Sequence, residues 1–237
     1  MPWFWEGLKS GVRTLRPRAP RLPAGVTPGR PATTAVPAGA SLDPELCPVG
    51  ALAPQDGAIA VDFDHCIHCM RCRPPASPVQ WQDDYRWALA AAPPLPPRFQ
   101  RSIHVRILDA GDCGGCLSEL RQLFGPVYSL HRYGIYVSPT PRDADVLLVV
   151  GPVTVGMRVA LEETYAAMPD PKRVVAVGVC ALNGGLFADS FAVVGGASRV
   201  VPVDVTVPGC PPPPLAILHA LELVTGSSRE AREVGDS

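Results

Sequence analysis

Eight cysteines are the residues of this 237-residue chain that could do chemistry together. They form two groups of four along the sequence. The first quartet is Cys47, Cys66, Cys69 and Cys72, and the second quartet is Cys113, Cys116, Cys180 and Cys210. Four thiolates complete the ligand set of one iron-sulfur cluster or of one structural zinc ion. The cysteine count therefore predicts two metal sites with no ligand left over.

Disulfides are the less favoured use of these cysteines. The N-terminal residues show neither a signal-peptide cleavage pattern nor an Arg-Arg export pair. No apolar run reaches the roughly 18 residues that would span a bilayer. We therefore expect a chain in the cytoplasm, where thiols stay reduced and remain available as ligands for soft metals.

The first quartet has the spacing of cluster ligands. In the run Cys66-x-x-Cys69-x-x-Cys72, three thiolates can converge on one cluster, and Cys47, which precedes a proline, offers the fourth ligand. Four-cysteine zinc sites usually pair two Cys-x-x-Cys hairpins, which is a different arrangement. The spacing thus favours an iron-sulfur cluster over zinc. Two histidines beside this run are assigned no role: His65 and His68.

This arrangement resembles the bacterial ferredoxin repeat over roughly forty residues, and in that repeat the cysteine before proline ligates the cluster held by the other half. A two-cluster ferredoxin would carry four further cysteines. This chain has other residues at those positions: Pro37, Ala40, Asp43 and Ala76. The resemblance implies a small ferredoxin-like domain reduced to a single 4Fe-4S cluster, with the first quartet as its ligands.

Each part of the second quartet follows a predicted strand. Cys113 and Cys116 come shortly after a strand that ends near residue 108, Cys180 follows a strand at 173–178, and Cys210 follows one at 200–207. In an open α/β sheet, ligands bind in the crevice at the carboxyl ends of the strands. One crevice could gather all four thiolates, and nearby glycines would allow close approach of the backbone to an inorganic cluster.

Apolar periodicity predicts the elements that position these cysteines. We expect strands at 103–108, 144–150, 173–178 and 200–207, and helices at 116–124, 156–167 and 214–224. The strands are rich in β-branched residues, as is typical of parallel strands covered on both faces. The alternation predicts an α/β fold, an open and mostly parallel sheet flanked by helices, preceded by the small ferredoxin-like α+β iron-sulfur domain.

Composition shifts predict the domain organisation, because proline clusters separate the pieces. The expected order is an amphipathic helix at 1–16, a Pro-rich linker at 17–42, the ferredoxin-like single-cluster domain at 43–81, a linker at 82–100, the α/β domain at 101–226 and a tail at 227–237. The N-terminal helix could dock on a partner or a membrane surface, or pack on its own domain.

Four ordered motifs of the α/β domain closely resemble one family. They are Cys113-Gly-Gly-Cys116, the run 144–154, Gly178-Val-Cys-Ala181 with Gly184-Gly185, and the run 203–212 that contains Cys210. Over roughly residues 101 to 225 the chain is similar to the small electron-transfer subunit shared by complex I and the complex I-like, membrane-associated nickel-iron hydrogenases. In complex I proper the first two cysteines are adjacent, whereas here two glycines separate them, as in the hydrogenase branch.

The resemblance implies that the second quartet binds the 4Fe-4S cluster nearest a catalytic metal site in a separate large subunit. The chain would then hold two 4Fe-4S clusters. Family members commonly carry acidic residues directly after the second cysteine and two positions further on. Glu119 matches the second of these and becomes the candidate catalytic residue that tunes the cluster or relays protons, whereas Leu117 departs from the first. Alternatively, the charge of Glu119 could simply stabilise the N-terminus of a helix.

We therefore expect an oxidoreductase subunit that relays electrons through two 4Fe-4S clusters to or from the large subunit of a complex I-like nickel-iron hydrogenase. Its partners would be that large subunit, the other subunits of a membrane-bound complex, and a ferredoxin-type electron donor or acceptor. It would be a cytoplasmic protein, peripheral on the inner face of the cell membrane. Two alternatives stay open: the equivalent subunit of a quinone-reducing NADH dehydrogenase-like complex, and a metal-stabilised structural or sensory module.

Charge and motif content argue against other classes. Lys and Arg number 21 against 22 Asp and Glu, so no basic surplus indicates nucleic acid as a partner. A nucleotide-binding enzyme is disfavoured because the chain has neither a Gly-x-Gly-x-x-Gly run nor a phosphate-loop lysine. Its only two lysines are Lys9 and Lys172.

Overall fold

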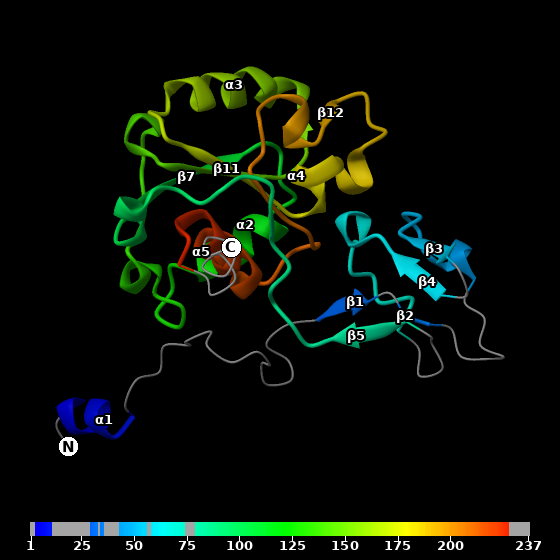
Figure 1. The fold of residues 1–237 in the computed structure, drawn as a ribbon, viewed down its shortest axis with the longest axis horizontal. Helices are drawn as coiled ribbons and strands as arrows, with labels where there is room; N and C mark the ends of the chain where they lie inside the picture. The colour runs from blue at the N-terminus through cyan, green and yellow to red at the C-terminus, as the bar shows by residue number, and fades with distance from the viewer. Residues whose placement is uncertain are drawn as a thin grey trace.

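The structure is a computed structural model that describes residues 3–10, 29–32, 34–35, 43–55, 58–73 and 79–227. Within these residues, the largest sheet has six strands in the order β6-β13-β11-β9-β7-β8 (Figure 1). Five of these strands run parallel to one another, and β6, at one edge, runs antiparallel to them. The strands are β6 (Leu89–Ala90), β7 (Ile103–Asp109), β8 (Ile135–Val137), β9 (Val146–Val150), β11 (Arg173–Val177) and β13 (Val205–Val207).

Helices cover both faces of this sheet. In Figure 1, α3 lies on one side of the strands, and α2 and α5 lie on the other. The described helices are α1 (Trp3–Ser10), α2 (Gly115–Gln122), α3 (Arg158–Ala167), α4 (Val179–Asn183) and α5 (Pro214–Thr225). Each of α2, α3 and α4 connects two parallel strands, as a parallel sheet requires. This confirms the predicted α/β class with an open, mostly parallel sheet flanked by helices.

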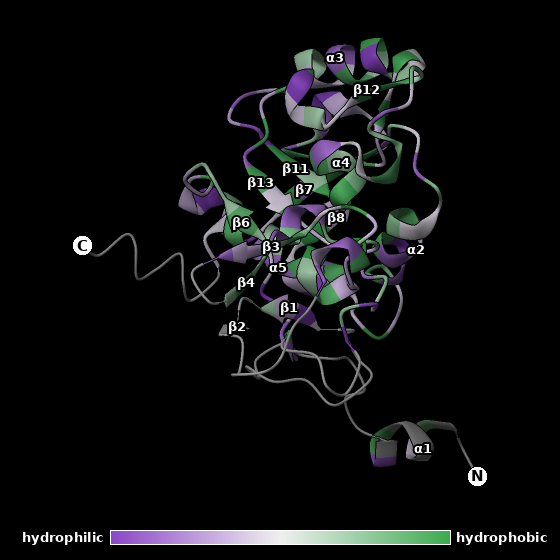
Figure 2. Cartoon of the chain, turned by 90° about the vertical axis from the view of Figure 1, so that its right-hand side faces the viewer, coloured by the Kyte–Doolittle hydropathy of each residue, from purple (hydrophilic) through white to green (hydrophobic). Residues whose placement is uncertain are grey.

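The two apolar cores explain why the central strands are apolar throughout. All five residues of β9 are buried. Its even-numbered side chains, including Leu148, pack with α2 and α5, and its odd-numbered ones, including Leu147, pack with α3. Because successive side chains point to opposite faces, a strand covered on both sides must be apolar at every position. Apolar residues accordingly dominate the central strands and α5 in Figure 2.

A smaller unit precedes this sheet. It contains a three-stranded antiparallel sheet in the order β2-β4-β3 and the separate antiparallel pair β1-β5. Its strands are β1 (Arg30–Ala32), β2 (Thr34–Ala35), β3 (Leu52–Gln55), β4 (Ala58–Val61) and β5 (Gln80–Gln82). Leu52, Ile59 and Val79 form a small buried core, with Cys47 and Cys72 packed against it. This unit therefore has its own apolar centre beside the first quartet.

The remaining described elements are short. The antiparallel pair β10 (Val153–Thr154) and β12 (Val193–Gly195) lies outside the large sheet. The 3-10 helices are η1 (Pro44–Leu46), η2 (Phe63–His65), η3 (Pro97–Gln100), η4 (Leu130–Tyr133), η5 (Pro141–Asp143), η6 (Val155–Met157), η7 (Gly185–Phe187) and η8 (Ala197–Arg199). None of the helices among the described residues is both long and apolar enough to cross a membrane.

The proline-rich segments contribute more structure than a linker would. The segment predicted as a linker at 17–42 contains β1 and β2, and the segment predicted at 82–100 contains β6, which pairs with β13. Trp87 and Leu95 from the second segment are buried in the main core.

The predicted strand at 200–207 is shorter than expected, since β13 begins at Val205. Just before it, the side chain of Asp204, and not a backbone carbonyl group, accepts the hydrogen bond from the backbone N–H of Val174. The rest of the predicted N-terminal helix, 11–16, and nearly all of the predicted tail, 228–237, lie outside the described residues.

Candidate metal centres

The second quartet lies at the carboxyl edge of the large sheet. Cys113 and Cys116 lie between β7 and the first turn of α2, Cys180 lies in α4 directly after β11, and Cys210 follows β13. Since β7, β9, β11 and β13 are parallel neighbours, their carboxyl ends meet at one edge. Strand order thus brings together cysteines that are up to 97 positions apart, as the numbers of Cys113 and Cys210 show.

The thiols of the second quartet lie close enough to affect one another's ionisation. Burial is the main cause that raises the pKa of Cys116, followed by the Asp112 carboxylate and then by Cys180, Cys210 and Cys113. Burial also raises the pKa of Cys180 to about 11, and Cys210, Cys113 and Asp112 add to that effect. The structure therefore gathers all four thiols, of which Cys116 and Cys180 are buried and Cys113 is exposed.

Two carboxylates hold the loop that carries Cys113 and Cys116. Oδ1 of Asp109 accepts hydrogen bonds from the backbone N–H groups of Gly111 (2.9 Å) and Asp112 (2.7 Å). Oδ2 of Asp112 accepts from those of Gly114 (2.9 Å) and Leu117 (3.0 Å), across the start of α2. These bonds satisfy amides that a helix N-terminus leaves free. Sequence reasoning missed both residues, although an aspartate two positions before a glycine is a turn signal.

Gly185 shows how closely the backbone approaches a thiol of this quartet. Its φ of +55° lies in the left-handed region. A Cβ at this position would lie 2.7 Å from Sγ of Cys180. A glycine is therefore needed for Cys180 to keep its place, both for conformation and for space.

The first quartet is built from two similar turns and one loop. Cys47 follows η1 and Cys66 follows η2, and in each turn an aspartate four residues earlier caps the 3-10 helix. Oδ1 of Asp43 accepts from the N–H of Glu45 (2.9 Å), and Oδ1 of Asp62 accepts from that of Asp64 (3.0 Å). The sequence therefore repeats one local structure, which delivers one cysteine from each turn. The other two predicted ligands, Cys69 and Cys72, lie in the irregular loop that follows η2.

That loop turns back on itself so that four thiols share one cavity. His68 and Met70 have positive φ angles of 52° and 61°, which reverse the chain between the cysteines. All four cysteines of the first quartet line a single cavity together with Trp81. Burial raises the pKa of the Cys66 thiol to about 11, partly offset by a hydrogen bond from the backbone of His68, and the other three thiols raise it further.

A family model described as NADH ubiquinone oxidoreductase, 20 Kd subunit, matches residues 113–224. This segment begins at the first cysteine of the second quartet and contains all four. The "Probable membrane-bound hydrogenase subunit mbhJ" of Pyrococcus furiosus is 42% identical over 123 residues, which are 52% of this chain and 74% of that protein. The chain belongs to this NADH ubiquinone oxidoreductase 20 Kd subunit family.

Other relatives of this 20 Kd subunit family member are oxidoreductase subunits too. "Formate hydrogenlyase subunit 7" of Escherichia coli is 41% identical over 129 residues, covering 54% of this chain and 51% of that protein. Chloroplastic "NAD(P)H-quinone oxidoreductase subunit K" of Anthoceros angustus is 41% identical over 123 residues, covering 51% of this chain and 50% of that protein. The chain thus spans about half the length of these two relatives. Among solved structures, a chain of the membrane-bound sulfane sulfur reductase is 27% identical, with a TM-score of 0.48, over 60% of this chain and 89% of that chain.

This family binds iron-sulfur clusters, and the donor set of the family member fits such a group. Within the part of the chain that the structure describes, no three His, Cys, Asp or Glu side chains gather closely enough to hold a single metal ion. A 4Fe-4S cluster spreads its ligands more widely, because each thiolate binds a different iron atom. The indole N–H of Trp81 is buried without a partner in hydrogen-bond geometry, yet it lowers the pKa of the Cys72 thiol against the larger upward effect of burial. A cluster in that cavity would offer this N–H a sulfur acceptor.

Glu119 lies on α2, one turn after Cys116, and is half-buried. Partial burial raises the pKa of its carboxyl group. Its Oε1 accepts a hydrogen bond from Nε2 of Gln122 (3.4 Å), and its charge raises the pKa of Tyr128, after the larger effect of burial. Glu119 therefore contacts Gln122 through this hydrogen bond and lies near enough to Tyr128 to affect its ionisation.

The two histidines of the first quartet's loop lie in different surroundings. Nδ1 of His65 lies 2.8 Å from Oδ2 of Asp62 at the surface. The ring nitrogens of His68 are buried without hydrogen-bond partners, and burial lowers the pKa of this ring to about 4. Its ring packs against Phe63, Trp81 and Trp87 at centroid distances of 5.4, 6.1 and 5.3 Å. His68 thus behaves as part of an aromatic cluster, whose two tryptophans the sequence pattern did not single out.

Proposed function

We propose that this chain is an electron-transfer subunit of a complex I-like nickel-iron hydrogenase and that each cysteine quartet binds one 4Fe-4S cluster. The observation that carries the proposal is the complete division of eight cysteines into two gathered sets. One set lies wholly in the segment that matches the 20 Kd subunit family, and the other lies wholly before it. Because the division leaves no cysteine over, we take both sets as ligand sets and not as cysteines that merely fill the apolar core.

The chain's own residues would prepare the second site in three ways. Cys116 and Cys180 are buried, so water would be largely excluded on their side of the site. Asp112 fixes the loop between the first two ligands, and Gly185 leaves room for the Cys180 thiol. When bound, a 4Fe-4S cluster supplies one-electron redox chemistry whose potential depends on burial and on hydrogen bonds to sulfur. We propose that Glu119, one turn after Cys116 on α2, tunes this site or relays protons.

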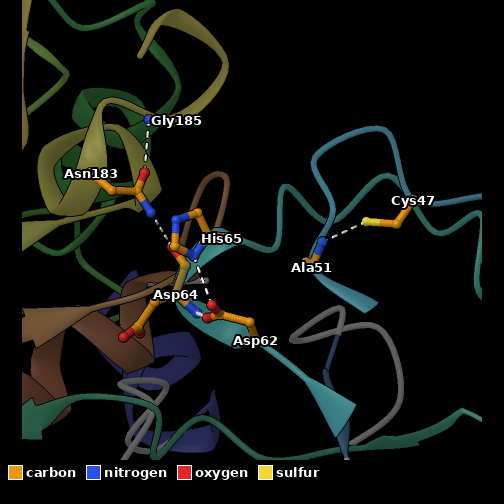
Figure 3. Close-up of polar contacts among 7 residues, drawn as sticks. All are labelled: Cys47, Ala51, Asp62, Asp64, His65, Asn183 and Gly185. Atoms are coloured by element: carbon orange, nitrogen blue, oxygen red, sulfur yellow. Dashed lines mark hydrogen bonds and ion pairs between the residues drawn. The ribbon is translucent and has the colours of Figure 1, made fainter. Parts of the chain in front are cut away.

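The first quartet would form a ferredoxin-like single-cluster domain at 43–81, attached to the family domain at 101–226. A backbone N–H already serves this quartet: Ala51 donates to Sγ of Cys47 at 3.2 Å (Figure 3). Such N–H groups favour the more negatively charged, reduced state of a cluster. The two domains in one chain would keep two redox sites at high effective concentration. A ferredoxin-type donor or acceptor would exchange electrons with this first site.

The names of the relatives support the proposed partners. Formate hydrogenlyase and the membrane-bound hydrogenase are named as hydrogenase systems, so we propose a large subunit with the catalytic metal site as the partner of the second quartet. We place the chain on the cytoplasmic, inner face of the cell membrane, held there by the other subunits of the complex. The alternative is a quinone-reducing complex, which the similarity to NAD(P)H-quinone oxidoreductase subunit K favours.

Anaerobic purification followed by metal analysis tests the proposal. We expect a brown protein with about eight irons and eight labile sulfides per chain, four of each for every cluster. Zinc without iron would contradict it, and clusters that cannot be reduced and reoxidised reversibly would support a structural or sensory module instead. The large subunit that copurifies separates the two branches, because a hydrogenase partner needs cysteine pairs for nickel and a quinone reductase does not.

A further inference from the structure

One side chain joins the two cysteine quartets. Nδ2 of Asn183 donates a hydrogen bond of 2.9 Å to the backbone carbonyl oxygen of Asp64, a residue 119 positions earlier in the chain (Figure 3). Asp64 belongs to η2, the turn that ends at Cys66. Asn183 is the last residue of α4, the helix that carries Cys180. The bond therefore links an element of the first quartet directly to an element of the second.

The amide of Asn183 is held in the orientation that this bond needs. Its Oδ1 accepts a hydrogen bond of 2.9 Å from the backbone N–H of Gly185, so Nδ2 is the atom left to point toward Asp64 (Figure 3). The chain reverses after Asn183 because Gly184 has a φ of +95° and its N–H bonds the carbonyl oxygen of Cys180 at 2.9 Å. The turn that positions the Cys180 ligand also orients the donor.

Aromatic packing holds η2, the turn that contains Asp64, at a second point. The ring of Phe63 lies edge-on to Trp87 at 5.2 Å, and His68 lies beside Trp87 at 5.3 Å. Trp87 is 1% exposed and belongs to the core of the α/β domain. Its indole N–H is fixed by the carbonyl oxygen of Asp84 at 2.8 Å. Apolar contact alone sets little direction, whereas a hydrogen bond to a pre-oriented amide fixes where η2 stands relative to α4.

We propose that Asn183 is a positioning residue that holds the Cys66 turn against the Cys180 helix and thereby fixes the separation of the two quartets. The consequence for electron exchange rests on the proposed function, since it requires a cluster in each quartet. Electron exchange between two redox sites falls steeply as their separation grows. A covalent connection alone keeps the sites near each other over a range of separations. The hydrogen bond of Asn183 fixes one separation within this range.

The substitution Asn183→Asp removes this bond selectively. A carboxylate has nearly the same shape and can still accept from the N–H of Gly185, but it has no N–H for the carbonyl oxygen of Asp64. It also adds a negative charge, so a matched control is Ala188→Asp, which adds the same charge on the exposed side of the following turn. Comparing the two variants separates loss of the bond from addition of the charge.

Hydrogen–deuterium exchange on the full-length, purified protein is the first measurement. The amides of His65 and Cys66 bond within η2, to Asp62 and Phe63. Loss of one hydrogen bond is worth about 0.5–1.5 kcal/mol, so Asn183→Asp should accelerate their exchange by about 2- to 13-fold. Ala188→Asp should leave it unchanged. Equal exchange in the two variants would overturn the proposal, whether or not clusters are bound.

The magnetic interaction between the two reduced clusters, measured by electron paramagnetic resonance, is the second readout. We expect the splitting to weaken or broaden in Asn183→Asp and to persist in Ala188→Asp, with iron content unchanged in both. Faster exchange with an unaltered splitting would show a contact that does not set the separation, and would also overturn the proposal. Iron for fewer than two clusters in the wild-type chain would instead contradict the proposed function, while the exchange experiment would still decide whether Asn183 docks the two units.

Discussion

Gly178 stands directly behind the second cysteine of the second quartet: a Cβ built on it would lie 2.5 Å from Sγ of Cys116. No side chain of any size fits there without moving the thiol. The φ of Gly178 is +84°, which L-residues rarely adopt. This glycine, at the end of β11, therefore leaves the space that the thiol of Cys116 on α2 occupies.

Gly178→Ala should accordingly remove the second site and leave the first. We expect loss of roughly four of eight irons per chain, together with a stability cost of about 1–3 kcal/mol from the strained φ. Iron analysis and urea unfolding check the two parts. Gly156→Ala is the matched control, because a Cβ at Gly156 meets nothing within 4 Å. Full iron content in Gly178→Ala would show that the thiol of Cys116 is free to move aside.

Trp81→Phe should lower the midpoint potential of the first cluster. The variant keeps the ring packing and removes the buried N–H, which acts on the Cys72 thiol. N–H donors favour the reduced cluster, so their loss favours oxidation, by roughly 20–60 mV for one electron. A redox titration followed by electron paramagnetic resonance measures the shift. Trp5→Phe on the exposed face of α1 serves as the control, and an unchanged potential in Trp81→Phe would show that its N–H does not face the cluster.

The sequence predicted the central strands well because their signal is local. Every residue of 146–150 is apolar since both faces of β9 are covered, and a continuous run of this kind needs no partner to be recognised. Strand order then placed Cys113, Cys180 and Cys210 at one edge. That inference used only the rule that ligands gather at the carboxyl ends of parallel strands.

The parts that sequence reasoning missed depend on partners far away in the chain. Leu89 and Ala90 lie between two proline clusters and form a strand only because β13 offers an open edge. Pro31 occurs in β1, which has a single neighbouring strand among the described residues and therefore loses little from the absent N–H. The Asn183 bond joins residues 119 positions apart through a backbone carbonyl group, which carries no side-chain signature at position 64. Such contacts depend on the fold and cannot be predicted from local sequence patterns.

Glu222 on α5 should make the stability of the chain depend on pH. Burial raises the pKa of its carboxyl group from 4.5 to about 7, although Arg86 acts in the opposite direction. Burial raises the pKa of the nearby Tyr85, and the charge of Glu222 adds a smaller increase. Below pH 4.5 the group is protonated in the folded and unfolded states. Between about 4.5 and 7 the unfolded chain ionises first, so stability falls as pH rises and stays lower above 7.

Glu222→Gln removes this titration. Relative to wild type, the variant should gain roughly 1–2 kcal/mol of unfolding free energy between pH 5 and pH 8, a figure reduced from the full linkage value because the group is only partly buried. Urea unfolding at both pH values gives the difference. If the difference in unfolding free energy between variant and wild type does not change with pH, Glu222 is already ionised in the folded protein at pH 5.

The last prediction separates the two quartets by removing one ligand from each. Of the proposed ligands, Cys69 is exposed in the first quartet's loop, and Cys210 is half-buried after β13. Because the quartets lie in different units with separate apolar cores, loss of one cluster should leave the other in place. Cys69→Ala should retain about four irons with the signal of the second cluster, and Cys210→Ala should retain about four with that of the first. Electron paramagnetic resonance of the two variants should sum to the wild-type spectrum apart from the interaction between clusters. Loss of all iron in either variant would instead mean that the eight cysteines form one cooperative unit, and the division into two sets would have to be abandoned.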